Sequence, residues 1–243
     1  MKTINKIIWL LILWLSSGIC YSQIEDNIVK KWEDNILQQI PTIKITEDYI
    51  KDLNFAKIWL DNRTCYLGYI GNDFQKLHVE FTKIEKKNNM EYTVEGNSRV
   101  KSNICRFNGV FKIVDIRKLK NKEYGVDDWM KGKIKEQGIV IVDFFLKEDS
   151  VQKGSGIFRG KLIFKWYLDN NGNLQYDDAR EDSDDYSNNQ FLGTWTSYKT
   201  NAVKRCAWGH YRIPNSGDLD IGAGEFSVNE KYINNGWNDV YCP

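Results

Sequence analysis

The chain has 243 residues and a formal net charge of +1 at pH 7. A charge so close to zero gives no electrostatic support for binding to nucleic acid or to an anionic membrane surface. Only three prolines and a 14% aromatic content argue against intrinsic disorder. Composition therefore favours a folded globular protein without a nucleic-acid partner.

The first 22 residues have the pattern of a signal peptide. Lys2 and Lys6 form a short positive region before an unbroken apolar run over residues 7–15, which is too short to span a bilayer. We expect cleavage after Ser22, which changes the net charge to −1 by removing the two lysines. Lipid attachment at Cys20 is the alternative, and the isoleucine before it disfavours this. No later segment is apolar enough to be a transmembrane helix, so the predicted location is periplasmic or extracellular.

Four cysteines follow the predicted cleavage site, and an even number in an exported protein suggests two disulfides. Three pairings are open, and the alternative is at least one free thiol. No CxxC pair occurs, so neither a zinc site nor a thioredoxin-like redox site is indicated. The four are Cys65, Cys105, Cys206 and Cys242.

Residues 25–40 predict an amphipathic helix, in which apolar side chains recur at helical spacing until Pro41 ends the run. We expect this helix to pack on the main domain or to close one end of it, and binding of a partner is the alternative. A shorter helix is expected over residues 46–53. Together these helices form an N-terminal helical segment, residues 23–54.

After residue 54 the hydrophobic period changes to two, as in strands with one buried face. Residues 77–81 and 158–168 show this alternation. Residues 139–146 form an apolar run broken only by Asp143, which predicts a more fully buried strand.

Turn residues separate the predicted strands. The pair Asn171-Gly172 is a strong hairpin signal, and residues 86–89 form a second turn. About eight to ten such strands predict one all-β domain over residues 55–243. Its expected architecture is an antiparallel, calycin-like barrel, with a β-sandwich as the alternative.

The most specific sequence lies in the C-terminal third, where residues 186–195 read YSNNQFLGTW and residues 208–226 read WGHYRIPNSGDLDIGAGEF. These stretches resemble a group of uncharacterised exported proteins of Bacteroidetes-type bacteria. The resemblance covers residues 66–237 and implies export and a bacterial origin, but no mechanism.

The Gly193-x-Trp195 sequence is also similar to the Gly-x-Trp of lipocalin-type barrels, in which the tryptophan packs across one barrel end against an arginine. By this resemblance, Arg205 or Arg212 would stack on Trp195. The lipocalin sequence opens its barrel, whereas this one lies near the end of the chain.

Asp218, Asp220 and Glu225 form the best candidate group of catalytic carboxylates. Paired carboxylates serve as general acid and as base or nucleophile in glycoside hydrolysis. Arg212 or His210 could tune their pKa values. The alternative is a rigid glycine-rich loop held by Arg212 through salt bridges and bonds to the backbone.

An acidic cluster lies just before the YSNNQ stretch. Calcium binds six to eight carboxylate and carbonyl oxygens, so Asp182, Asp184 and Asp185 are weak candidates for a calcium site. A solvated acidic loop is the simpler interpretation. No cofactor-binding sequence occurs: the glycines of residues 154–160 miss the dinucleotide pattern and run into a predicted strand.

Aromatic side chains are the other candidates for ligand contacts, because a flat ring stacks on apolar surface while its polar edge forms hydrogen bonds. Trp129, Trp208 and Trp237 lie in loop-like sequence and are expected at a ligand rim. Trp129 belongs to a long charged connection, residues 117–137, which is expected to be a lid or a solvated loop.

The leading function hypothesis is therefore non-catalytic binding of a small apolar molecule or a glycan. The predicted ligand-binding residues are Trp129, Trp208, Arg212, Asp218, Asp220 and Trp237. One alternative is a glycosidase-like hydrolase that uses Asp218, Asp220 and Glu225. The other is a structural or protein-interaction module of the cell envelope.

Overall fold

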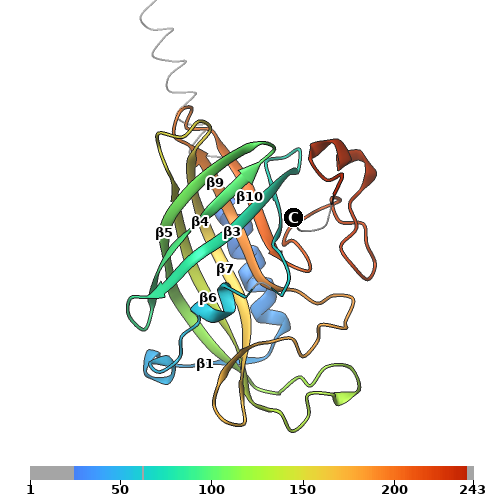
Figure 1. The fold of residues 1–243 in the computed structure, drawn as a ribbon. Helices are drawn as coiled ribbons and strands as arrows, with labels where there is room; N and C mark the ends of the chain where they lie inside the picture. The colour runs from blue at the N-terminus through green and yellow to red at the C-terminus, as the bar shows by residue number, and fades with distance from the viewer. Residues whose placement is uncertain (1–24, 62, 240–243) are drawn as a thin grey trace, which may run out of the picture.

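The computed structural model describes residues 25–61 and 63–239. The predicted signal peptide, Cys20 and Cys242 lie outside the described residues. A ten-stranded antiparallel sheet dominates the structure (Figure 1), which confirms the all-β class. The strands are β1 (Thr42–Lys44), β2 (Leu67–Ile70), β3 (Gln75–Lys86), β4 (Glu91–Val100), β5 (Asn103–Leu119), β6 (Ile134–Glu148), β7 (Gly156–Asp169), β8 (Leu174–Tyr176), β9 (Asn188–Ser197) and β10 (Val203–His210).

The strands pair into a closed ring. Their order is β5-β4-β3-β2-β10-β9-β7-β6, and β6 pairs again with β5. β1 is added to β5, and β8 is added to β7. The ring is compatible with both architectures expected from the sequence. The two predicted turns are found between β3 and β4 and between β7 and β8.

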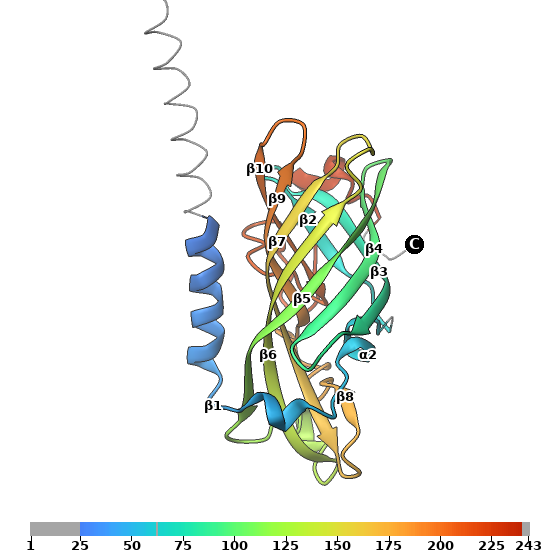
Figure 2. The same cartoon turned by 90° about the vertical axis from the view of Figure 1, so that its left-hand side faces the viewer.

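A helix over residues 25–39 lies alongside the ring (Figure 2). Its apolar side, including Trp32, Ile36 and Leu37, packs on Ile139 and Ile141 of β6 and on Ile163 of β7. At its first described turn, Glu25 accepts hydrogen bonds from the Arg205 guanidinium of β10 at 2.7 and 2.9 Å. The helix therefore packs on the domain, as predicted, and it explains why β6 is apolar on both faces.

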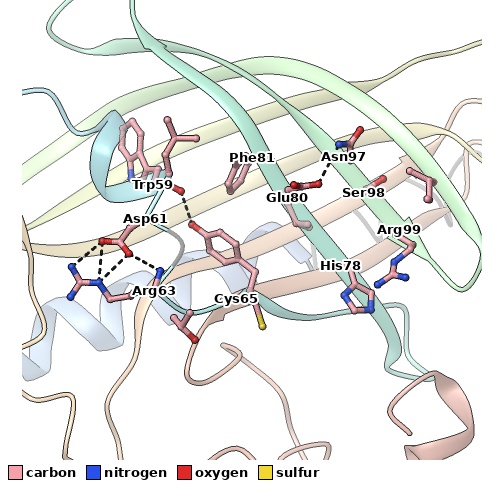
Figure 3. Close-up of a pocket in the computed structure, with 15 residues that line it drawn as sticks. Trp59, Asp61, Arg63, Cys65, His78, Glu80, Phe81, Asn97, Ser98 and Arg99 are labelled. Atoms are coloured by element: carbon pink, nitrogen blue, oxygen red, sulfur yellow. Dashed lines mark hydrogen bonds and ion pairs between the residues drawn. The ribbon is translucent and has the colours of Figure 1, made fainter. Parts of the chain in front are cut away.

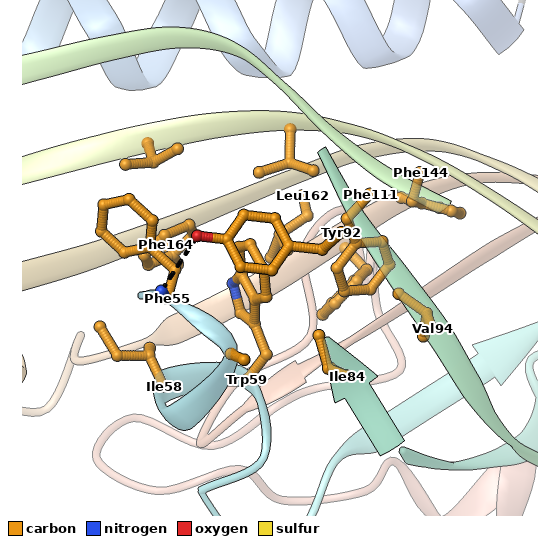
Figure 4. Close-up of a cluster of buried hydrophobic side chains, with 14 of the residues drawn as sticks. Phe55, Ile58, Trp59, Ile84, Tyr92, Val94, Phe111, Phe144, Leu162 and Phe164 are labelled. Atoms are coloured by element: carbon orange, nitrogen blue, oxygen red, sulfur yellow. Dashed lines mark hydrogen bonds between the residues drawn. The ribbon is translucent and has the colours of Figure 1, made fainter. Parts of the chain in front are cut away.

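The inside of the ring is filled by aromatic side chains (Figure 4). At one end, the short helix α2 (Ala56–Trp59) places Trp59 edge-on against Tyr92, with ring centroids 4.8 Å apart. The backbone N–H of Phe55 donates to the Tyr92 hydroxyl at 3.2 Å, which fixes α2 in place. Further along, Phe191 stacks on Trp208 at 4.8 Å.

The helix expected over residues 46–53 is only partly correct. The structure has a 3-10 helix, η1 (Glu47–Ile50), followed by α2, which was not predicted. Strands β5 and β6 extend into the predicted long connection, leaving residues 120–133 between them, with a short 3-10 helix η2 (Val126–Asp128).

After β10, residues 211–239 run over the outer side of β2 and β10 without forming another strand. Ile213, Leu219 and Trp237 pack there against Tyr69 and Ala207. A 3-10 helix, η3 (Glu230–Asn235), precedes Trp237. This segment contains most of the predicted site residues.

The prediction that all four cysteines form disulfides is wrong for two of the cysteines. Cys105 and Cys206 are buried free thiols, each enclosed in the ring wall. Cys65 is disulfide-bonded. No helix of the described residues is both long and apolar enough to cross a membrane.

Candidate functional site

A pocket of about 720 Å³ opens where β2 and β3 diverge. The two strands pair only through Tyr69–Lys76 and Ile70–Gln75, so residues 78–81 of β3 have no strand partner on that side. Asp61 and residues 63–66, which follow α2, line the opposite side of the opening (Figure 3). Strand β4 continues the β3 wall.

The wall formed by β3 and β4 presents hydrogen-bonding groups to the pocket. In the register of the two strands His78 pairs with Arg99, and Glu80 pairs with Asn97. The Asn97 side-chain amide donates to the Glu80 carboxylate at 3.4 Å. Alternation along the strands therefore places two directly opposed polar pairs in one site.

The apolar part of the pocket consists of aromatic side chains. Tyr66 lies edge-on to Phe81, with ring centroids 5.5 Å apart. The Tyr66 hydroxyl donates to the backbone carbonyl of Trp59 at 3.3 Å, which ties the segment to α2. Burial raises the pKa of Tyr66, so this hydroxyl stays protonated.

An ion pair occupies the end of the pocket near α2. Asp61 accepts hydrogen bonds from the Arg63 backbone N–H at 2.9 Å and from its guanidinium at 3.0 Å. A second Arg63 nitrogen donates to Asp178 at 2.8 Å. Burial opposes ionisation of Asp61, but the hydrogen bonds and charge of Arg63 outweigh it and lower the Asp61 pKa.

The other end of the pocket is cationic. Arg99 forms no ion pair or side-chain hydrogen bond with any described residue, and its guanidinium points toward the His78 ring (Figure 3). Burial, together with the charges of Arg99 and Lys76, lowers the pKa of His78 to about 4. His78 is therefore neutral at pH 7, and Arg99 carries the charge at this end.

Behind Tyr66 lies a fully buried histidine. The rings of Tyr66 and His210 are 4.2 Å apart, and the Tyr176 hydroxyl lies 3.0 Å from His210 Nδ1. Burial lowers the pKa of His210 to about 3, so it is neutral at pH 7. Its Nε2 has no hydrogen-bond partner among the described residues.

Arg212, predicted to bind ligand, instead holds the glycine-rich loop. It donates to Asp220 at 2.6 Å and to the backbone carbonyls of Gly222 and Ala223 at 3.0 and 3.1 Å. The other Asp220 oxygen accepts from the backbone N–H of Gly222 at 3.0 Å and of Ser227 at 3.1 Å. This is the arrangement given as the alternative to a catalytic loop.

The remaining predicted carboxylates have different surroundings. Asp218 is exposed and accepts hydrogen bonds from Lys231 and from the Tyr232 hydroxyl, the latter at 2.7 Å. Glu225 is exposed. None of the three lines the pocket at β3 and β4.

The predicted tryptophan rim is not found. Trp208 lies in β10 rather than in a loop and is fully buried against Phe191. Trp237 is also buried, and its indole N–H donates to the Phe74 carbonyl at 2.7 Å. Trp129 is 41% exposed, and its N–H donates to the Ala179 carbonyl at 2.9 Å. Trp208 is therefore a core residue inside the ring, and Trp237 is a core residue of the cluster on its outer side.

The lipocalin-type arrangement around Trp195 differs as well. Lys204 lies over its ring at 6.0 Å, while Arg205 pairs with Glu25 and Arg212 holds the loop. The Trp195 N–H donates to the buried Glu148 carboxylate at 2.9 Å.

The acidic cluster has protein partners. Asp185 pairs with Arg180 at 2.9 Å, and the backbone carbonyl of Asp184 accepts from Arg212 at 2.9 Å. Across residues 25–61 and 63–239, no group of three or more His, Cys, Asp or Glu side chains could hold a metal ion. Asp182, the third predicted calcium ligand, is therefore not part of such a group either.

Sequence reasoning missed this pocket. His78 and Glu80 are visible as the polar positions of an alternating strand, but the same pattern describes any solvated face. Residues 61–66 show no periodicity in the sequence, so no signal indicated that Asp61 and residues 63–66 lie opposite β3. Comparison of the chain with family models, curated proteins and solved structures found no match.

Proposed function

We propose that this protein is a non-catalytic glycan-binding protein that holds its ligand between Asp61 and residues 63–66 on one side and strands β3 and β4 on the other. The observation that supports this most is the pocket of about 720 Å³, which combines aromatic rings with carboxylate, amide and imidazole groups. Sugars present an apolar ring face and a rim of hydroxyls, which match these two kinds of group.

A glycan is favoured over a small apolar ligand because the inside of the ring is occupied. Trp59 lies edge-on to both Phe111 and Phe164, with ring centroids 5.2 Å apart in each pair, where a barrel-type carrier would hold an apolar molecule. The pocket itself is lined by many polar side chains, and their desolvation by an apolar ligand would be unfavourable.

Binding is favoured over hydrolysis by the state of the pocket carboxylates. Glycoside hydrolysis uses a pair of carboxyl groups, one as acid and one as base or nucleophile. In the pocket Asp61 is engaged by Arg63, which leaves Glu80 as the carboxylate available to a ligand. The Asp218–Glu225 group belongs to the C-terminal segment and lies outside the pocket lining.

The test is to probe a panel of immobilised neutral and acidic oligosaccharides with the protein lacking residues 1–22. Any retained oligosaccharide is then titrated in solution by calorimetry. Asn97→Ala removes a donor to the ligand and the partner of Glu80, so affinity should fall about tenfold. Asn108→Ala, an exposed asparagine of β5 outside the pocket, is the matched control and should leave affinity unchanged. Failure to retain any oligosaccharide, or equal effects of the two variants, would overturn the proposal.

A further inference from the structure

We infer that the glycan bound in this pocket is acidic, with a sugar carboxylate held by Arg99 and hydroxyls held by Glu80 and Asn97. This inference rests on the proposed function and specifies its ligand class. It is carried by the placement of charge within the pocket.

The two arginines of the pocket differ in whether a carboxylate is bound to them. Arg63 is bound by Asp61 and by Asp178, so its charge is already compensated. Arg99 has no carboxylate within 4.0 Å among the described residues, although it is only half-exposed. A partly buried guanidinium without a counter-ion is a ready binding group for a carboxylate, which it can hold through two parallel hydrogen bonds.

The neighbours of Arg99 increase the attraction for an anion. His78 lies beside it and is neutral at pH 7. Lys76, two residues earlier on β3, adds positive charge, although its ammonium donates to the backbone carbonyl of Asp239. The Asp239 carboxylate partly offsets this charge. The result is a cationic end of the pocket, opposite the compensated Asp61–Arg63 end.

The spacing of the polar groups suits a single sugar ring. Glu80 and Arg99 are diagonal neighbours across β3 and β4, because Glu80 pairs with Asn97 and His78 pairs with Arg99. Diagonal positions on an antiparallel pair are about 7–8 Å apart. A carboxylate at one end of a sugar can therefore reach Arg99 while its hydroxyls meet Glu80 and Asn97. Glu80 also disfavours a second negative charge at that position.

The experiment compares an oligogalacturonate with a neutral galacto-oligosaccharide of equal length, titrated by calorimetry into the protein lacking residues 1–22. We expect tighter binding of the oligogalacturonate, weakening as salt rises from 50 to 500 mM because the contact is ionic. Arg99→Gln should weaken oligogalacturonate binding by about 10- to 100-fold, the effect of a lost charge-assisted contact. Arg99→Lys, which keeps the charge but not the paired donors, should recover part of this loss.

Lys112→Gln is the control for net charge, because it removes one positive charge from an exposed position of β5 outside the pocket. It should leave the affinity within twofold. Tighter or equal binding of the neutral ligand, with no effect of Arg99→Gln, would overturn the inference and leave the proposed glycan binding standing. Absence of binding to either ligand and to every oligosaccharide of the panel would overturn both.

Discussion

Two buried titratable side chains, His210 and Asp177, make the stability of this protein depend on pH in opposite directions. Burial lowers the pKa of His210 to about 3 and raises the pKa of Asp177 to about 6. Asp177 lies against the Gln137 amide at 3.3 Å, and it accepts from the Ala179 N–H at 3.2 Å. Both groups are therefore neutral in the folded protein at mildly acidic pH, although each is charged over much of that range when unfolded.

For His210 the sign follows from its low folded pKa. The unfolded histidine binds a proton near pH 6.5, whereas the folded one does so only near pH 3. Stability from His210 is thus fully present above pH 6.5 and is lost as the pH falls toward 3. Between pH 7 and 4.5 the loss amounts to about 2.5 kcal/mol. We expect the stability advantage of the wild type over His210→Asn to shrink by this amount, as measured by urea unfolding at several pH values.

Asp177 is the control, because its contribution to stability should change with pH in the opposite direction. Its folded pKa is above the unfolded value of 3.8, so its stability contribution is present below pH 3.8 and is lost as the pH rises through 6. The stability difference between wild type and Asp177→Asn should therefore grow toward acid pH while the His210 difference shrinks. Two differences that did not change with pH would show that these groups are not buried as described.

At the scale of strands and helices, alternation of polar and apolar residues predicted the strands correctly. The short helices between strands were predicted only in part. The polar and apolar positions of residues 77–81 and 158–168 lie as predicted, because one side of each strand faces the ring interior. Helix α2 was missed because its four residues form less than two turns and are fixed by contacts with Tyr92 and Phe164. Such contacts join residues far apart in the chain, and local periodicity does not contain them.

The close approach of β7 and β9 is a second feature that was not predicted. Two glycines that face each other are its only sign in the sequence. Gly160 and Gly193 are direct partners in the register of these strands. A Cβ on Gly193 would lie 2.0 Å from the Arg159 carbonyl oxygen and 2.8 Å from the Gly160 Cα. Both are backbone atoms, so a change of rotamer cannot relieve the clash. We expect Gly193→Ala to lower the free energy of unfolding by about 3 kcal/mol or more, measured by chemical denaturation.

Gly224→Ala is the matched control for that substitution. The nearest atom to its added Cβ is a side-chain oxygen of Asp184 at 3.4 Å, an ordinary contact. Its effect should stay within about 0.5 kcal/mol. If both variants lowered the free energy of unfolding equally, β7 and β9 would have to lie further apart at Gly193 than in this structure.

At the scale of the whole molecule, the ring needs a cover on the outer side of β6 and β7. Residues 139–142 are all completely buried, which a strand with one solvated face cannot achieve. The apolar run of β6 and the amphipathic helix over residues 25–39 were both predicted, but the sequence did not pair them. Nothing local specifies which strand a helix covers, since that depends on the closure of the ring.

Trp32 tests whether this cover is part of the fold. It contacts Ile139 and Ile141 of β6 and also the cluster around Leu192 and Ala207, so it connects the helix to both sides of the covered face. Trp32→Ala should lower the free energy of unfolding by about 2–3 kcal/mol, less than for a fully buried tryptophan because Trp32 is only half-buried. Asn35→Ala, on the exposed side of the same helix, should change it by less than about 0.5 kcal/mol. If the helix detaches in Trp32→Ala, the apolar face of β6 becomes exposed, and binding of a hydrophobic dye should rise in that variant alone. Unchanged stability and dye binding would mean that the strands form a stable ring without their helical cover.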